Sequence, residues 1–342
     1  RKMPLDDKDS AYMARALRLA EKGMYTTMPN PRVGCVVVLA DQIVGEGWHE
    51  VTGQPHAEVN ALSAAGDRAA GATAYVSLEP CSHTGKTGPC CDALIEAGIS
   101  RLVFGMEDPN PEVGGMGLMK LREAGLQVEG PLMEEECRAL NPGFTRRMER
   151  QLPFVRIKSA MSLDGRTAMA SGESKWITAP QARADVQRLR ARSCAIISGI
   201  NTVLSDNAAF TVRPAEMKID NPEAAASKQP LRVILDSSLR LTQHSELIST
   251  HTPILLVHAK TDSEPADKWP AHVELLSLPG VDGRVDLLKL LQELARRQCN
   301  EVLVEAGPTV AGSFLRKGLL DELIVYMAPK LMGSEARPLF EL

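Results

Sequence analysis

The sequence lacks both a long apolar stretch and a secretory signal. None of its uninterrupted apolar runs reaches the length of about 20 residues that a membrane-spanning helix requires. A basic segment followed by an apolar one, the mark of a signal peptide, is also missing. We therefore expect no membrane partner and a cytoplasmic protein. Because the chain opens on Arg1 instead of Met, we expect that further residues precede it.

The sequence also lacks an excess of positive charge. It carries 39 Lys and Arg against 43 Asp and Glu, a formal net charge of −4. Residues 1–150 hold 16 basic and 21 acidic side chains, and the remainder holds 23 and 22. Binding to nucleic-acid phosphates is driven by a basic excess, so we expect no nucleic-acid partner.

Cysteines are few and odd in number. The seven are Cys35, Cys81, Cys90, Cys91, Cys137, Cys194 and Cys299. A small secreted scaffold held by disulfides would be shorter and denser in cysteine. In a reducing cytoplasm, clustered cysteines indicate metal binding or catalysis instead.

What the sequence does contain is an alternation of helical and strand patterns, which is typical of α/β layer folds. The first helix is expected over residues 10–22 with Ser10 as its N-cap, and a hairpin follows from residues 33–39 and a strand beginning at Ile43. Residues 214–230 are expected to form a surface loop. The other expected elements are helices over residues 56–65, 91–97, 118–123, 134–140, 180–192, 286–297 and 309–317, and strands over residues 73–78, 101–106, 126–128, 154–159, 195–198, 232–236, 254–257, 301–304 and 322–327.

The length of the chain indicates two domains. Its 342 residues exceed what one core usually organises, and a content of 44% hydrophobic residues excludes a disordered chain. The helical pattern breaks at Asn141-Pro142-Gly143, and a charged stretch precedes a new strand after Pro153. We therefore expect one domain over residues 1–148 and another over residues 149–342.

The most specific motif combines His56-Ala57-Glu58 with Cys81 and Cys90, each of which follows a proline. One imidazole and two thiolates suit zinc, and three protein ligands leave a fourth position open for water, which the metal activates as a nucleophile. Glu58 can reach that water as an acid–base group. The pattern matches the known signature of zinc deaminases. A structural zinc site would need a fourth protein ligand, Cys91 or His83, and would leave Glu58 unexplained.

Four segments resemble the deaminase domain of the bifunctional riboflavin-biosynthesis deaminase–reductase family. They are Asn30–Gly34, His56–Glu58, Pro80–Cys90 with its long spacing between the cysteines, and Asp108–Pro111. The resemblance implies a three-layer, cytidine-deaminase-like domain with zinc ligands His56, Cys81 and Cys90 and with Glu58 as the proton shuttle. It also implies that the substrate, a diaminopyrimidinone with a ribosylamino 5-phosphate, is contacted by Asn30, His49, His83 and Lys86.

The second half lacks the G-x-G-x-x-G motif of Rossmann domains; a near match, Gly114–Gly117, lies in the first half and is interpreted as a loop. Strand–Gly–helix turns at Gly199–Leu204 and at Glu305–Thr309 nevertheless indicate a ligand site, since helix N-termini bind phosphate. Ser162–Gly165 and Ser174–Thr178 add polar and aromatic groups to it.

Residues 153–340 resemble the reductase domain of the same family, whose fold is similar to dihydrofolate reductase. The resemblance implies a homodimer formed through this domain and two sets of site residues. NADPH contacts fall on Ala160, Trp176, Thr202, Asp206, Ser237, Gly307, Pro308, Thr309, Val310, Ala311, Gly312 and Ser313. Contacts to the ribosylamino-uracil phosphate fall on Ser174, Arg190, Phe210, Arg213 and Glu305. The chain departs from the family at Asn207-Ala208 and at Ala306, and it ends at Leu342, before an expected closing strand.

The expected protein is thus a two-step enzyme of riboflavin biosynthesis, a zinc-dependent deaminase followed by an NADPH-dependent reductase that converts the ribosyl group to ribityl. One alternative is a nucleic-acid or nucleoside zinc deaminase fused to an unrelated reductase-like domain. Another is a zinc-stabilised binding module without catalytic activity. Ammonia release and NADPH oxidation with the small phosphorylated pyrimidine substrate would distinguish the three.

Overall fold

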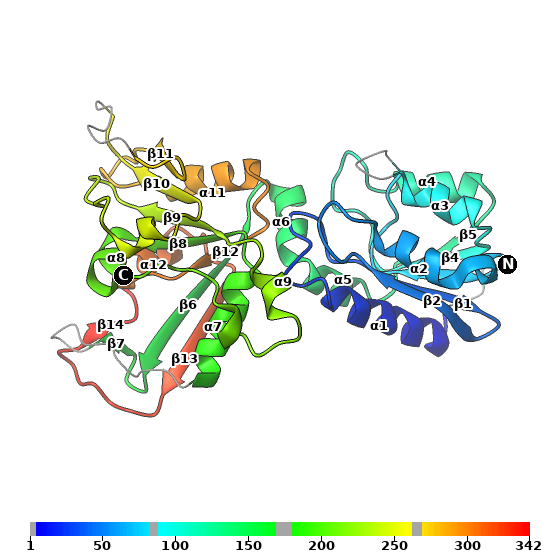
Figure 1. Cartoon of the computed structure of the whole chain (residues 1–342), viewed down its shortest axis with the longest axis horizontal. Helices are drawn as coiled ribbons and strands as arrows, with labels where there is room; N and C mark the ends of the chain where they lie inside the picture. Colours follow the sequence, from blue (N-terminus) through cyan, green and yellow to red (C-terminus); the bar gives the residue numbers. More distant parts are fainter. Residues whose placement is uncertain (1–4, 83–87, 169–179, 262–268) are drawn as a thin grey trace. The chain divides into compact units, whose positions relative to one another are not determined.

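The computed structural model describes residues 5–82, 88–168, 180–261 and 269–342. The chain divides into two compact units, Arg1–Arg150 and Gln151–Leu342 (Figure 1). Each unit has its own hydrophobic core and its own main sheet. Within the described ranges, no helix has the length and apolar character needed to cross a membrane.

The first unit is built on a five-stranded sheet in the order β2-β1-β3-β4-β5. Strand β1 runs antiparallel to β2 and β3, whereas β3, β4 and β5 are parallel. The expected hairpin is therefore confirmed. The strands are β1 (Gly34–Leu39), β2 (Gln42–Trp48), β3 (Thr73–Val76), β4 (Arg101–Phe104) and β5 (Gln127–Glu129).

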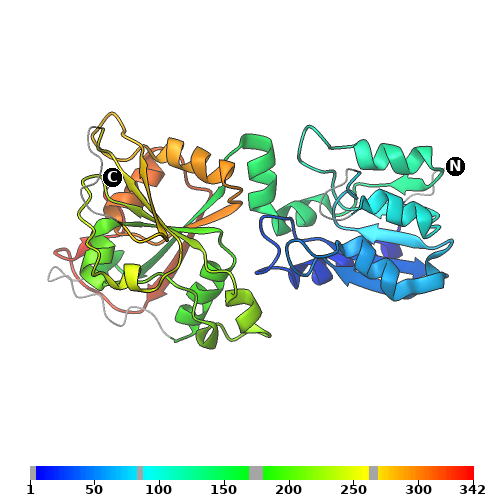
Figure 2. The same cartoon turned by 45° about the horizontal axis from the view of Figure 1, so that its top comes forward.

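Helices cover both faces of this sheet, which confirms the expected three layers. Glycines let two of them approach closely: a Cβ at Gly34 would lie 1.9 Å from the Ala16 carbonyl oxygen of α1, and one at Gly45 would lie 2.2 Å from that of Ala61 in α2. Helix α1 packs on one face, and α2, α3 and α4 lie on the other (Figures 1 and 2). The helices are α1 (Asp7–Glu21), α2 (Ala57–Ala65), the 3-10 turn η1 (Gly66–Ala69), α3 (Cys90–Glu96), α4 (Met116–Glu123), α5 (Glu134–Leu140) and α6 (Pro142–Arg150).

Two expectations about helix ends were wrong. Helix α1 is capped by Asp6 instead of Ser10, because the Asp6 carboxylate accepts from the Asp9 amide while the Asp9 side chain accepts from the Asp6 amide. The segment after Asn141 is not a break that leads into a linker, since helix α6 starts there. Pro142 suits the first position of a helix, where its missing N–H has no intrahelical partner to lose.

The second unit holds a seven-stranded sheet in the order β11-β10-β9-β8-β12-β6-β13, and every neighbouring pair in it is parallel. A short antiparallel ribbon, β7 with β14, forms a separate two-stranded sheet. The strands are β6 (Phe154–Ser162), β7 (Arg166–Ala168), β8 (Ala195–Gly199), β9 (Leu231–Leu235), β10 (Ile254–His258), β11 (Val273–Ser277), β12 (Glu301–Val304), β13 (Glu322–Ala328) and β14 (Arg337–Pro338).

Successive residues of the central strands enter different cores on the two faces of this sheet. Ile197 packs in the core that contains α11 residues, and its neighbour Ile196 packs with residues of α7, α8 and α10. The expected loop 214–230 contains two short helical pieces, η2 and α9. The helices of this unit are α7 (Pro180–Ala191), α8 (Ile200–Asp206), η2 (Pro214–Glu216), α9 (Pro222–Ala226), α10 (Glu246–Ser249), α11 (Leu287–Arg296) and α12 (Pro308–Arg316).

Candidate functional site

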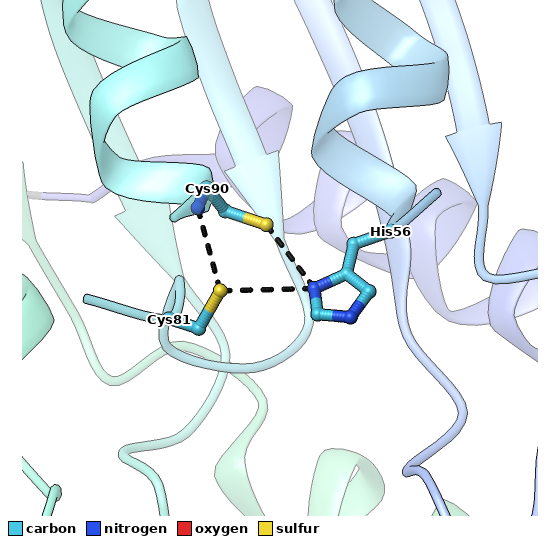
Figure 3. A group of neighbouring side chains, drawn as sticks. All are labelled: His56, Cys81 and Cys90. Carbon is cyan, nitrogen blue, oxygen red and sulfur yellow. Dashed lines mark hydrogen bonds between the residues drawn. The ribbon is translucent and has the colours of Figure 1, made fainter. Parts of the chain in front are cut away.

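Three side chains of the first unit converge from different elements. His56 directly precedes α2, Cys90 opens α3, and Cys81 lies in the segment after β3 (Figure 3). The His56 Nδ1 atom lies 3.2 Å from Cys90 Sγ and 3.7 Å from Cys81 Sγ. The Cys90 amide donates to Cys81 Sγ over 3.3 Å. Among the described residues, these three form the one group of His, Cys, Asp and Glu side chains able to hold a metal ion.

The spacing of this triad fits zinc. Tetrahedral ligands with Zn–S bonds of about 2.3 Å and Zn–N bonds of about 2.1 Å lie roughly 3.6–3.8 Å apart. The ligand atoms of the triad lie within 4.8 Å of one another. The Cys90 thiol, followed by His56, lowers the pKa of the Cys81 thiol well below its usual value, although burial opposes this. A thiolate at Cys81 is the form that binds metal.

Glu58 lies in the first turn of α2, next to this triad, and is 3% exposed. Burial, followed by the negative charge of the Cys81 thiolate, raises the pKa of its carboxyl to about 7, although hydrogen bonds and the nearby His56 lower it in part. Its carboxyl is thus held apart from bulk water and beside the metal ligands. This environment suits a group that takes up and releases a proton.

Two further predicted residues border the triad. The ring of His49 packs edge-on against that of His56, with 5.3 Å between the centroids, and its Nε2 atom lies 3.2 Å from Asn30 Nδ2. The other two predicted substrate contacts, His83 and Lys86, lie outside the described residues. Cys91 is not in the metal group; its thiol donates to the Pro80 carbonyl over 3.3 Å.

In the second unit, a cavity of about 790 Å³ opens where β8, β9 and β12 end. Such carboxyl ends of parallel strands are the usual ligand sites of α/β sheets. Predicted cofactor residues that line it are Thr202, Ser237, Gly307, Pro308, Thr309, Val310 and Ser313. Ala311 and Gly312 belong to the same helix but are buried behind this wall. Sequence analysis missed Asp236, which also lines the cavity and is buried at the end of β9.

A second cavity of about 620 Å³ shares Thr202, Gly307 and Pro308 with the first, so that the two form one cleft. Ala160 and Asp206, which were predicted to contact the cofactor, line this second part. So do three residues predicted to contact the substrate: Arg190, Phe210 and Glu305. Trp176 and Ser174 lie outside the described residues.

The two arginines predicted to contact the substrate have different surroundings. Arg190 forms two hydrogen bonds with the Glu305 carboxylate, of 2.6 Å and 2.9 Å, and a third with the Thr211 carbonyl oxygen. Arg213 lines neither cavity; it pairs with Glu216, and 57% of its side chain is exposed.

Lys158 was missed by sequence analysis. It lines the second cavity, and its Nζ lies 3.9 Å from the Glu305 carboxylate. Its position in β6, two residues before Ala160, is the signal that could have found it, since such residues share one face of a strand.

Two family models match the chain. The cytidine and deoxycytidylate deaminase zinc-binding region matches residues 6–106, and the RibD C-terminal domain matches residues 153–342. The match to each model falls within one of the two compact units. The expected fold classes, a deaminase-like first unit and a reductase-like second unit, are confirmed.

The chain also resembles whole proteins. It is 51% identical over 335 residues to the riboflavin biosynthesis protein RibD of Escherichia coli K12, covering 97% of this chain and 90% of that one. The Haemophilus influenzae RibD is 48% identical and covers 99% of this chain and 91% of its own length. The Acinetobacter baumannii RibD structure is similar with a TM-score of 0.89 and 45% identity, covering 98% of this chain and 90% of that one. The Thermotoga maritima deaminase/reductase structure has a TM-score of 0.84 and 34% identity, covering 97% and 90%. The chain therefore belongs to the RibD family of bifunctional deaminase–reductases of riboflavin biosynthesis.

Proposed function

We propose that the first unit hydrolyses the ring amino group of a diaminopyrimidinone that carries a ribosylamino 5-phosphate. The second unit then reduces the ribosyl group of the product to ribityl with NADPH. The observation that carries the first half of this proposal is the triad of His56, Cys81 and Cys90 beside the buried Glu58. The cleft at the strand ends of the second unit supports the other half.

In the deaminase site, His56, Cys81 and Cys90 would hold one zinc ion. Zinc in such a site supplies Lewis-acid activation of water for attack on the ring carbon. Glu58 takes the proton from the attacking water and delivers it to the departing amino group, which leaves as ammonia. Burial of Glu58 supports this role, because bulk water does not compete for that proton.

Asn30 and His49 contact the pyrimidine in this proposal. Their side chains are hydrogen-bonded to each other, and the His49 Nδ1 atom lies 3.1 Å from the Pro55 carbonyl oxygen. This second partner fixes the orientation of the imidazole, so that the Asn30 amide is also held at a defined angle. His83 and Lys86 remain predicted contacts of the substrate and its phosphate.

In the reductase site, NADPH occupies the cavity formed by the ends of β8, β9 and β12, with its phosphates near the start of α12. Gly307 is the N-cap of this helix and has no side chain. Because Pro308 has no N–H, the amides of the first turn that can bind an anion are those of Thr309 and Val310. Thr202 and Ser237 add hydroxyl groups to the same cavity. The sugar phosphate occupies the adjoining part, beside Arg190, Glu305 and Phe210.

We also propose that the chain forms a homodimer through its reductase unit. Strand β13 is an edge strand of the seven-stranded sheet, and Leu323 and Met327 on it are 40% and 56% exposed. Met327→Lys should therefore convert a dimer to a monomer in sedimentation analysis.

The seven cysteines, all within the described residues, form no disulfide, as is usual in a reducing compartment, and this supports a cytoplasmic protein. The absence of a basic excess argues against a nucleic-acid partner.

Chelation tests the proposal, because the two reactions draw on different groups. Removal of zinc should abolish ammonia release from the diaminopyrimidinone and leave NADPH oxidation with the pre-deaminated substrate nearly intact. Loss of both reactions in folded protein would refute separate sites. Deamination of nucleosides or single-stranded DNA in place of this substrate would favour the alternative deaminase.

A further inference from the structure

We propose that Glu79 is a positioning residue of the deaminase site. Its buried carboxylate fastens the start of α4 to the segment that carries the zinc ligand Cys81. The inference rests on the proposed zinc site and extends it to a residue that lies outside the metal group.

The carboxylate of Glu79 is surrounded by backbone donors. It is 5% exposed and accepts hydrogen bonds from four amides, those of Asp108 at 3.0 Å, Gly115 at 2.9 Å, Gly117 at 2.8 Å and Leu118 at 3.4 Å. Both carboxylate oxygens are used. A carboxylate buried with this many backbone N–H partners is a strong link between two chain segments.

Helix α4 explains why a carboxylate is needed at this place. Its N-cap is Gly115, which has no side chain to accept from the amides of the first turn. Glu79 supplies that acceptor from another part of the chain, and its negative charge faces the positive end of the helix. The interpretation of Gly114–Gly117 as a loop is therefore wrong in part, because Gly117 lies inside helix α4.

Contacts on the other side connect this helix start to the metal ligands. A Cβ at Gly117 would lie 2.1 Å from the Pro80 carbonyl oxygen, so the two backbones touch. The Cys91 thiol lies 3.3 Å from that same oxygen and 3.6 Å from the Gly117 carbonyl oxygen. The Cys91 amide donates to the Cys81 carbonyl over 3.1 Å. A shift of α4 is therefore transmitted to the backbone on which the Cys81 thiolate is mounted.

Glu79→Gln tests this role because it keeps the size of the side chain and replaces one acceptor oxygen by an amide donor that faces N–H groups. Glu129→Gln is the matched control: Glu129 is also 5% exposed in the first unit, but its partners are the side chains of Arg101 and Gln127. Zinc affinity is measured by competition with a chelator, and thermal unfolding is measured on the zinc-free proteins. Outer partners of metal ligands typically change metal affinity by about 10–100-fold.

We expect Glu79→Gln to lose about 10–100-fold in zinc affinity. Glu129→Gln should lower the unfolding temperature of the zinc-free protein and keep the zinc affinity of the parent. The inference would be overturned if Glu79→Gln and Glu129→Gln both kept the zinc affinity of the parent, or if both lost zinc affinity to the same extent. If Glu79→Gln does not fold, Glu79→Asp is used instead, because its shorter side chain cannot reach all four amides. A zinc affinity of Glu79→Asp equal to that of the parent would overturn the inference. A parent protein that binds no zinc would refute the proposed site itself.

Discussion

Replacement of Arg190 by methionine is the perturbation whose cost follows most directly from the structure. The guanidinium forms a two-point ion pair with Glu305, whose side chain is 7% exposed, and the Arg190 side chain is 13% exposed. Methionine keeps most of the aliphatic stem and removes the charge. The variant therefore leaves the Glu305 carboxylate buried without its main partner.

The size of this effect follows from the burial of the pair. Breaking a buried ion pair by removal of one partner costs about 3–5 kcal/mol. Lys158, at 3.9 Å from Glu305, retains part of the compensation, so we expect about 3 kcal/mol. For a unit of this size, that corresponds to a fall in the unfolding temperature of roughly 6–12 °C.

Arg213→Met is the matched control. The exposed fractions of the Arg213 and Glu216 side chains are 57% and 39%, so their ion pair contributes about 0–1 kcal/mol. A second comparison adds Glu305→Leu to Arg190→Met. The double variant should regain stability relative to Arg190→Met, because an apolar pair of similar volume replaces the unpaired carboxylate.

Scanning calorimetry of the zinc-loaded chain measures these differences through the unfolding transition of the second unit.

The dependence of the Arg190→Met penalty on pH provides an internal check. Burial raises the pKa of Glu305, but the charge and hydrogen bonds of Arg190 outweigh it, so the pKa lies below its usual 4.5. In the parent, the pair therefore stabilises the fold at pH values above the usual pKa of the carboxyl. Arg190→Met removes the charge that lowers this pKa, so the carboxyl of the variant takes up its proton at a higher pH. The penalty of Arg190→Met should shrink as the pH falls from the pKa in the variant to the lowered pKa in the parent. A penalty for Arg190→Met as small as that for Arg213→Met at pH 7 would refute the reasoning.

Three further predictions concern the first unit. Glu58→Gln should retain zinc and lower ammonia release by roughly 10²–10⁴-fold, and near-normal release with zinc bound would contradict its role. Metal analysis should find zinc in Cys91→Ser and none in Cys81→Ser; loss of zinc from Cys91→Ser would contradict the ligand set. Burial raises the pKa of Asp9, but hydrogen bonds from Arg101 and other donors lower it to about 2 from 3.8. Asp9→Asn should therefore cost about 2 kcal/mol in urea unfolding at pH 7, and a gap that persists at pH 2 would contradict this assignment.

The deaminase site could be predicted from the sequence because its ligands occupy element ends with local signals. His56 precedes a helix, Cys90 opens one, and the spacing of these residues from Cys81 is characteristic. Hairpins and buried strands were predictable for the same reason, since their periodicity is local. The start of α6 was not, because Pro142 is compatible both with a break and with the first turn of a helix.

The reductase cleft was less predictable because it depends on pairings between distant residues. Arg190 and Glu305 are 115 positions apart in the sequence. Their ion pair gives Arg190 surroundings that differ from those of the exposed Arg213. The sequence alone had predicted the same role for both arginines. Lys158 lines the cleft from strand β6. Which face of this strand points toward the cleft depends on the elements that pack against it. No local pattern records these neighbours.

Glu79 and Glu129 show what limits the prediction of buried contacts from the sequence. Both are buried glutamates of the first unit, and both follow or end a strand of the same sheet. Arg101, the main partner of Glu129, is a charged side chain that appears in the sequence, so a pairing can be guessed. The partners of Glu79 are backbone amides, which every residue except proline carries, so no residue type reveals them. A buried carboxylate with backbone partners can therefore be recognised in the structure and not in the sequence. Its effect on the site depends on what the bonded segment contacts, which for Glu79 is the Pro80–Cys81 backbone.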